Sequence, residues 1–136
     1  KKMDSVFKKD KKYIYYFKFE INDKKIIYRF LEILVNLRCK LFKSPYGDQG
    51  LLIHRETYKK NNGFKELPLM EDLDFIQRLN NEDLKQIKTS ILTSSRKWEK
   101  TNIIFQSIRN WKFRQRWYKG EPISILYQEY YKNRAN

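Results

Sequence analysis

The pattern of apolar and polar positions divides the chain into strand-like and helix-like segments. Residues 13–21 are rich in aromatic and isoleucine side chains and lie between lysines and Asn22-Asp23, which predicts a strand. Over residues 24–42 the apolar side chains recur every three to four positions, the spacing of an amphipathic helix. They are Ile27, Phe30, Leu31, Leu34, Leu37 and Leu41. Pro45 lies beyond the end of this helix, because the residue before a proline avoids helical geometry.

The rest of the chain continues the alternation of strands and helices. The segments that follow are a short strand over 50–54, a short helix over 55–61 closed by Asn62-Gly63, a helix starting near Asp72 and ending by Asn80, and a strand over 84–93. Two further helices are predicted over about 99–132, one starting at Glu99 and stopped by Gly120 and the other starting near Pro122. Strands that alternate with helices indicate an α/β fold class. At 136 residues we expect a single domain over 1–136.

Composition adds a strong positive charge to this picture. Thirty lysines and arginines against sixteen acidic residues give a net charge of +14, which favours a polyanionic partner such as nucleic acid, anionic lipid or a diphosphate. The alternative is a solvated lysine-rich surface without a binding role. An apolar share of 40% is ample for a folded core and argues against a disordered chain. Charged residues interrupt the longest apolar stretch, Ile26 to Phe42, which excludes an ordinary transmembrane span.

Two residue types that often carry chemistry occur once each. Cys39 excludes an intrachain disulfide, and its place in an apolar helical stretch predicts a buried thiol. A single cysteine is compatible with a reducing cytoplasm. His54 has no second histidine, cysteine or suitably spaced carboxylate beside it, so a zinc site is not expected. We expect instead a histidine that is hydrogen-bonded or lies at the surface.

Three polar segments stand out. Gly47-Asp48-Gln49 and Gly50 form a glycine-flanked turn, which is typical of a binding-site wall but also of an ordinary turn that leads into a strand. Glu71 and Asp72 place two carboxylates at the start of a predicted helix, where an aspartate most often serves as an N-cap. Arg96-Lys97-Trp98 follows the predicted strand over 84–93, where a solvated basic loop is the simpler interpretation.

In this order, the segments resemble the acceptor-side half of a bacterial family-2 glycosyltransferase of the GT-A fold. The resemblance runs from about Tyr15 to Tyr130. It rests on three stretches: Gly47-Asp48-Gln49, Asn62-Gly63-Phe64-Lys65-Glu66-Leu67-Pro68-Leu69-Met70-Glu71-Asp72, and Thr93-Ser94-Ser95-Arg96-Lys97-Trp98-Glu99. Gln115-Arg116-Trp117 lacks the Gln-x-x-Arg-Trp spacing of processive polysaccharide synthases. This departure favours the transfer of single sugars over the synthesis of a polymer.

The resemblance implies transfer of a sugar from a nucleotide-sugar donor to an acceptor hydroxyl, with inversion. It implies that Asp72 is the general base that takes the hydroxyl proton and that Glu71 is its positioning partner. It implies further substrate contacts from Gly47, Asp48 and Gln49 at the sugar, and from Arg96, Lys97 and Trp98 over the nucleotide diphosphate.

The resemblance also implies that part of the machinery lies elsewhere. The nucleotide-binding strands and the Asp-x-Asp motif belong to a preceding half, for which the residues before Tyr13 leave no room. A divalent metal, Mg²⁺ or Mn²⁺, is expected in that half, with no metal site in residues 1–136. We therefore expect the C-terminal part of a GT-A fold, a mixed sheet edge flanked by helices, inactive alone. A cytoplasmic location at the inner face of the membrane and a lipid-linked acceptor are expectations of the same kind.

Basic and aromatic residues interleave between Arg109 and Lys119, and three interpretations compete. The segment is an interfacial helix on anionic lipid, a nucleic-acid surface, or a helix that buries its apolar residues Ile104, Ile108 and Trp111 and leaves the charges solvated. No standard DNA- or RNA-binding motif occurs, so no specific nucleic-acid partner is expected. The alternative to a glycosyltransferase is thus a small basic α/β module that binds nucleic acid or an anionic membrane surface.

Overall fold

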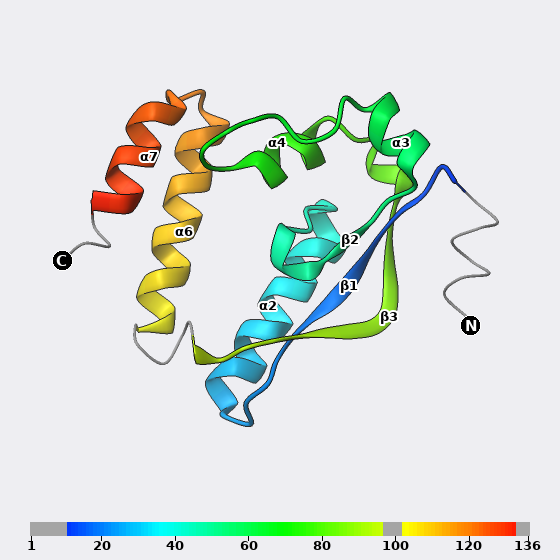
Figure 1. The fold of residues 1–136 in the computed structure, drawn as a ribbon. Coiled ribbons are helices and arrows are strands. Elements are labelled where there is room, and N and C mark those ends of the chain that lie inside the picture. The colour runs from blue at the N-terminus through cyan, green and yellow to red at the C-terminus, as the bar shows by residue number, and fades with distance from the viewer. Residues whose placement is uncertain (1–10, 97–101, 133–136) are drawn as a thin grey trace. The chain divides into compact units, whose positions relative to one another are not determined.

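The computed structural model describes residues 11–96 and 102–132, and its contacts divide into two compact units (Figure 1). The first, here called the sheet unit, holds the described residues up to Lys65 together with Asp72–Ser94. The second, called the helical unit, holds Glu66–Glu71 and the described residues from Ser95 onward. The expectation of a single partial domain over 1–136 stays a prediction.

A three-stranded mixed sheet with the order β2-β1-β3 forms the centre of the sheet unit. β1 (Ile14–Ile21) pairs in parallel with β3 (Leu84–Thr93) and antiparallel with β2 (Leu51–Leu52). The parallel pair needs a crossover connection, and the first element of that connection is a long helix. Helices flank this sheet, so the α/β fold class is confirmed.

Most of the predicted elements in the sheet unit are confirmed. Its helices and helical turns are α2 (Ile26–Phe42), η1 (Gly47–Gln49), α3 (Arg55–Lys60), α4 (Glu71–Gln77, of which Glu71 falls in the helical unit) and η2 (Asn81–Asp83). The strand predicted over 84–93 has those bounds, whereas the strand predicted over 50–54 is only the two residues of β2. Asn62 and Gly63 have positive φ angles of 57° and 54° after α3, as the Asn-Gly pair predicts.

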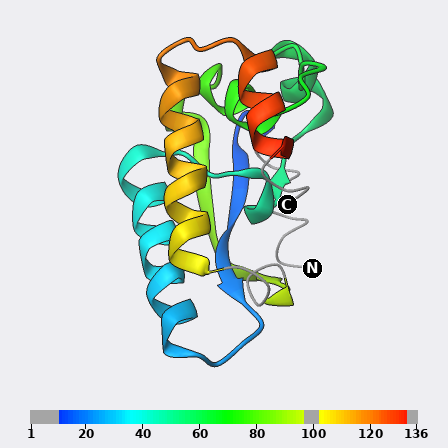
Figure 2. The same ribbon diagram turned by 90° about the vertical axis from the view of Figure 1, so that its left-hand side faces the viewer.

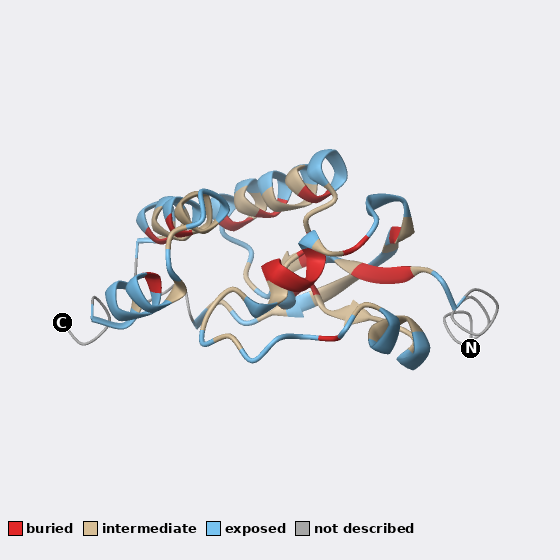
Figure 3. Cartoon of the chain, turned by 90° about the horizontal axis from the view of Figure 1, so that it is seen from above, coloured by how far each residue is buried: buried red, intermediate tan, exposed pale blue. Residues whose placement is uncertain are grey.

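The core lies where β1 and the start of β3 meet α4. Its buried members are Ile14, Tyr16, Cys39, Phe75, Ile76, Leu79 and Leu84. The strand that follows the grey N-terminal trace in Figure 3 is β1, and its first residues are drawn as buried. Burial of each large apolar side chain stabilises the fold by about 1.5–3 kcal/mol, so this cluster holds the sheet against α4. The predicted burial of Cys39 is confirmed.

α2 runs beside β1 and contacts it through polar side chains (Figures 1 and 2). The side-chain amide of Asn36 accepts a hydrogen bond from the Phe19 N–H and donates one to the Phe19 carbonyl, both at 3.0 Å. Glu32 Oε1 accepts from the Ile21 N–H at 2.6 Å. β2 pairs only with the first part of β1, at Tyr15 and Tyr16. The side chains of α2 therefore satisfy backbone groups on the edge of β1 that β2 leaves open.

As a consequence, the apolar stripe of α2 points away from the sheet. An amphipathic helix usually turns its apolar face inward, but the inward face here is Tyr28, Glu32 and Cys39. The exposed side chains are Ile26, Ile27, Phe30, Ile33, Leu34, Leu37, Leu41 and Phe42. The periodicity thus predicts the helix correctly but not the face that it buries.

The helical unit contains a helix hairpin formed by α6 (Ile103–Tyr118) and α7 (Ile123–Lys132). The Phe113 and Tyr130 rings meet edge to face, 5.4 Å apart, and Arg109 donates a hydrogen bond of 2.7 Å to the Tyr130 carbonyl. Gly120, with φ of 81°, ends the first helix as predicted. The predicted start at Glu99 lies outside the described residues. None of the described helices is both long enough and apolar enough to cross a membrane.

Candidate functional site

Asp72 connects the start of α4 to the turn η1. Its Oδ2 accepts a hydrogen bond of 2.8 Å from the Gly47 N–H, and its Oδ1 accepts one of 2.8 Å from the Leu73 N–H. Gly47 and Asp72 are 25 residues apart in the sequence. The structure therefore brings together two of the three segments on which the resemblance rests.

This contact forms because helical turns begin with N–H groups that have no partner within the helix. Gly47 is the first residue of η1 and Leu73 the third of α4, so both N–H groups belong to this class. One carboxylate satisfies a group from each turn. Asp72 thus serves part of the capping role that its position at a helix start predicts, and it also joins two separate elements.

The Asp72 carboxylate keeps the capacity to bind a further group. It is only partly buried, and each carboxylate oxygen can accept two hydrogen bonds. Each of its oxygens accepts one backbone bond here, which fixes the orientation of the side chain. The arrangement suits a carboxylate that receives a proton or hydrogen bond from the hydroxyl group of a bound molecule.

Gln49, predicted to contact substrate, is fully buried. Its Oε1 accepts hydrogen bonds from the Cys39 thiol at 2.9 Å, the Tyr46 N–H at 3.1 Å and the Arg38 guanidinium at 3.3 Å. The Arg38 guanidinium also stacks over the Tyr46 ring, 3.7 Å from its centroid. Gln49 therefore holds the turn against α2 instead of facing solvent. Asp48 contributes its backbone to η1, and its side chain is not among those described.

The place of the remaining predicted site residues relative to Asp72 stays a prediction. Glu71, the first residue of α4, is exposed and falls in the helical unit. Arg96 is also exposed and belongs to the helical unit. Lys97 and Trp98 lie outside the described residues. Among the described residues of the sheet unit, the structure brings Asp72 and Gly47 together.

An ion-pair cluster next to the site was not predicted. Asp74 accepts hydrogen bonds from Lys65 Nζ at 2.8 Å and from Arg78 Nε at 3.0 Å. Arg78 also donates to the carbonyls of Asn61 and Gly63, which ties the end of α3 to α4. Burial would raise the pKa of Asp74, but the hydrogen bonds from Lys65 and Arg78 outweigh it and hold that pKa below its ordinary value. Asp74 and Arg78 are four residues apart on a predicted helix, and this spacing is the sequence signal that could have predicted their ion pair.

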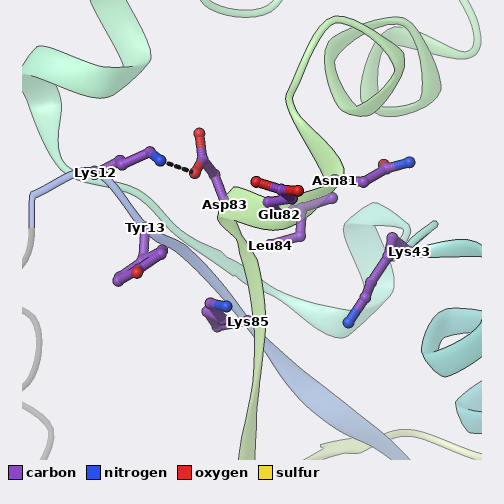
Figure 4. Close-up of a pocket in the computed structure, with 8 residues that line it drawn as sticks. All are labelled: Lys12, Tyr13, Lys43, Asn81, Glu82, Asp83, Leu84 and Lys85. Atoms are coloured by element: carbon purple, nitrogen blue, oxygen red, sulfur yellow. Dashed lines mark ion pairs between the residues drawn. The ribbon is translucent and has the colours of Figure 1, made fainter.

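A hollow of about 370 Å³ lies at the start of the sheet (Figure 4). Its lining residues are Lys12, Tyr13, Lys43, Asn81, Glu82, Asp83, Leu84 and Lys85. Three lysines face two carboxylates there, and Lys12 pairs with Asp83 at 2.9 Å. A second hollow, of about 410 Å³, lies at the turn after β1. Neither hollow is lined by Asp72 or Gly47.

Within residues 11–96 and 102–132, no three His, Cys, Asp or Glu side chains come close enough together to hold a metal ion. His54 instead accepts a hydrogen bond from the Glu56 N–H through Nδ1, at 3.3 Å, and caps α3. The resemblance assigns the divalent metal to a preceding half, so the metal stays a prediction.

Comparison with known proteins finds no family model, no curated protein and no solved structure that matches this chain.

Proposed function

We propose that this chain is the acceptor-side part of an inverting family-2 glycosyltransferase of the GT-A fold. The enzyme transfers a sugar from a nucleotide-sugar donor to an acceptor hydroxyl, with Asp72 as general base. The observation that carries the proposal is the 2.8 Å hydrogen bond from the Gly47 N–H to Asp72 Oδ2. The resemblance selected these two segments from the sequence, without knowledge of the fold. Residues that act together in one reaction have to lie at one site.

In the proposed step, an Asp72 oxygen takes the proton of the acceptor hydroxyl as the hydroxyl oxygen forms a bond to the anomeric carbon of the sugar. The bond from that carbon to the diphosphate oxygen breaks, and its electron pair leaves with the diphosphate. One positioned base contributes about 10²–10⁴-fold to such a step. Gly47 and Leu73 orient the carboxylate through their N–H groups.

The other residues take lesser or indirect roles in this proposal. Gln49 supports the turn from inside, so the sugar contacts fall to Asp48 and to the Gly47 backbone. Glu71 helps to position Asp72, and the segment Arg96-Lys97-Trp98 covers the diphosphate. Donor nucleotide and metal bind to a separate nucleotide-binding half of the enzyme, and this chain supplies no metal ligand in the proposal.

The test is a transfer assay on the natural protein that contains residues 1–136. A panel of nucleotide sugars is mixed with candidate acceptors, and nucleoside diphosphate release and product anomer are measured. We expect release with at least one donor and a product whose anomeric configuration is inverted. Retention of configuration, or no release with any donor, would contradict the proposal.

The 136-residue chain alone gives a second measurement. We expect calorimetry to detect no binding of a nucleotide sugar at low-micromolar affinity, because the donor half of the site lies elsewhere in the proposal. Tight binding to this chain would mean that it holds a complete donor site, and the assignment to an acceptor-side part would then be wrong.

A further inference from the structure

α6 carries an apolar stripe on the side that lies opposite its contact with α7. The stripe consists of Ile104, Ile108, Trp111 and Tyr118, which recur on one side of the helix and are 57%, 48%, 53% and 44% exposed. The opposite side holds Gln106 and Phe113, which are buried, and Phe113 is the residue that meets Tyr130 of α7. The interpretation that α6 buries Ile104, Ile108 and Trp111 is therefore wrong.

Basic side chains border this stripe on both sides. By helical periodicity, Lys112 and Lys119 lie along one border and Arg114 along the other. The hairpin from residue 102 to residue 132 contains six basic and two acidic residues.

Both acids of the hairpin are neutralised locally. Arg116 donates hydrogen bonds to Glu121 and Glu129, and these bonds lower the pKa of both carboxyl groups. The two negative charges are thus paired with one arginine, and the border around the apolar centre, which includes Lys112 and Lys119, keeps a net positive charge.

An apolar centre with a basic border matches the interface of an anionic membrane. Helices that lie on such a surface bury aliphatic and aromatic residues among the acyl chains and place lysines and arginines at the headgroups. A nucleic-acid surface uses a basic groove with stacking aromatic rings, and two isoleucines in the centre add nothing to such binding. We propose that α6 binds the surface of anionic lipid membranes through this stripe. The inference does not depend on the proposed enzymatic function.

Vesicle co-sedimentation of the chain tests the proposal at roughly 0.15 M salt. We expect partition onto phosphatidylcholine vesicles that contain about 30% phosphatidylglycerol, and much weaker partition onto phosphatidylcholine alone, because anionic lipid attracts each basic residue near the surface by about 1 kcal/mol. In a chain with Trp98→Phe and Trp117→Phe, the emission of Trp111 should move to shorter wavelength when the anionic vesicles are added.

Matched variants distinguish binding through the stripe from binding that depends only on total exposed apolar surface or total charge. Trp111→Ser should lower the partition coefficient at least about tenfold, and the pair Lys112→Glu with Lys119→Glu at least about 25-fold. Ile33→Ser on α2, where the side chain is 62% exposed, and the pair Lys59→Glu with Lys60→Glu on α3 serve as controls. The controls should leave partition within about twofold. Circular dichroism verifies that each variant folds.

Several outcomes would overturn the proposal. Equal loss in the control and stripe variants would show that binding follows total charge or hydrophobicity. Binding to DNA or RNA at this salt without vesicle binding would favour a nucleic-acid surface. The chain could also fail to bind vesicles and instead self-associate. If Trp111→Ser abolished that self-association, a second copy of the chain would be the group that covers the stripe.

Discussion

Two aspartates on α4, only two residues apart, are held in opposite ways. Asp72 is partly exposed and accepts its hydrogen bonds from two backbone N–H groups. Asp74 is buried and is bound by the charged side chains of Lys65 and Arg78. Backbone groups orient a carboxylate but leave its negative charge uncompensated, whereas a lysine and an arginine neutralise it. The first arrangement suits reaction with an added group, and the second suits stabilisation of the fold.

The largest expected effect concerns Asp72 and activity. In the natural protein that contains this chain, Asp72→Asn should lower turnover at least about 10²-fold, because an amide cannot accept the hydroxyl proton. Its free energy of unfolding should fall by only about 1 kcal/mol, since the asparagine oxygen still accepts one of the two backbone hydrogen bonds. Steady-state transfer kinetics and urea unfolding measure the two. Normal turnover in a folded variant would reduce Asp72 to a structural residue.

Asp74→Asn should show the reverse pattern. We expect a loss of about 2 kcal/mol in the free energy of unfolding, because the amide pairs poorly with Lys65 and Arg78. Turnover per folded molecule should stay within about twofold of the unsubstituted protein. If Asp74→Asn lowers turnover as much as Asp72→Asn does, the division of roles between the two aspartates is wrong.

The contribution of Asp74 should also depend on pH. Its pKa in the folded protein lies below the ordinary value of 3.8, so the folded state binds this proton less readily than the unfolded state. Its contribution to stability is fully present above that ordinary value and is lost as pH falls through the lower, folded value. Urea unfolding at a series of pH values should show the gap between the unsubstituted chain and Asp74→Asn closing only in strong acid. A gap that closes near neutral pH would contradict the assignment.

The smallest expected effect concerns the Gly47 N–H. Proline suits the first position of a helical turn, and Tyr46 already has the extended conformation that precedes a proline, with φ of −109° and ψ of 170°. Gly47→Pro should keep the turn but remove one donor to Asp72. The proline Cδ takes the place of the N–H hydrogen, so Asp72 Oδ2 must also move away, and turnover should fall by at least about fivefold, or ~1 kcal/mol.

Gly47→Ala is the matched control for that change. It keeps the N–H group, and its added Cβ would meet Asp72 Oδ2 at 3.4 Å, an ordinary contact. Transfer kinetics should place the alanine variant near the unsubstituted enzyme and the proline variant below it. Equal rates for the two variants would show that this hydrogen bond does not contribute to activity.

The local pattern was sufficient for the elements but not for their faces. Periodicity predicts α2 and the bounds of β3, because both depend on neighbouring residues. It does not predict that Glu32 and Asn36 bond to β1, since those partners lie 11 and 17 residues away. The pattern therefore could not show that the apolar stripe of α2 is exposed.

For the candidate site too, the sequence identifies some of the residues but not the contacts between them. Turn chemistry and a helix start identify Gly47 and Asp72 as residues of interest, but only the fold brings them within hydrogen-bonding distance. Gln49 has the composition of a binding residue and becomes a buried support, because Cys39 and Tyr46 surround its amide. Asp74 was missed because its partners lie on both sides of it in the sequence. Lys65 lies before α4, and Arg78 lies one residue past the end of that helix.

The side chains of α2 that bond to the edge of β1 couple two events. They are the detachment of α2 from the sheet and the hydrogen exchange of amides in β1. The amide hydrogens of Phe19 and Ile21 are held by Asn36 and Glu32 of α2, not by another strand. When α2 lifts away, these two amides become open to deuterium while β1 and β3 remain paired. The same event uncovers a strand edge that a second chain could extend. The attachment of α2 therefore sets both the exchange rate of two strand amides and the exposure of the sheet to aggregation.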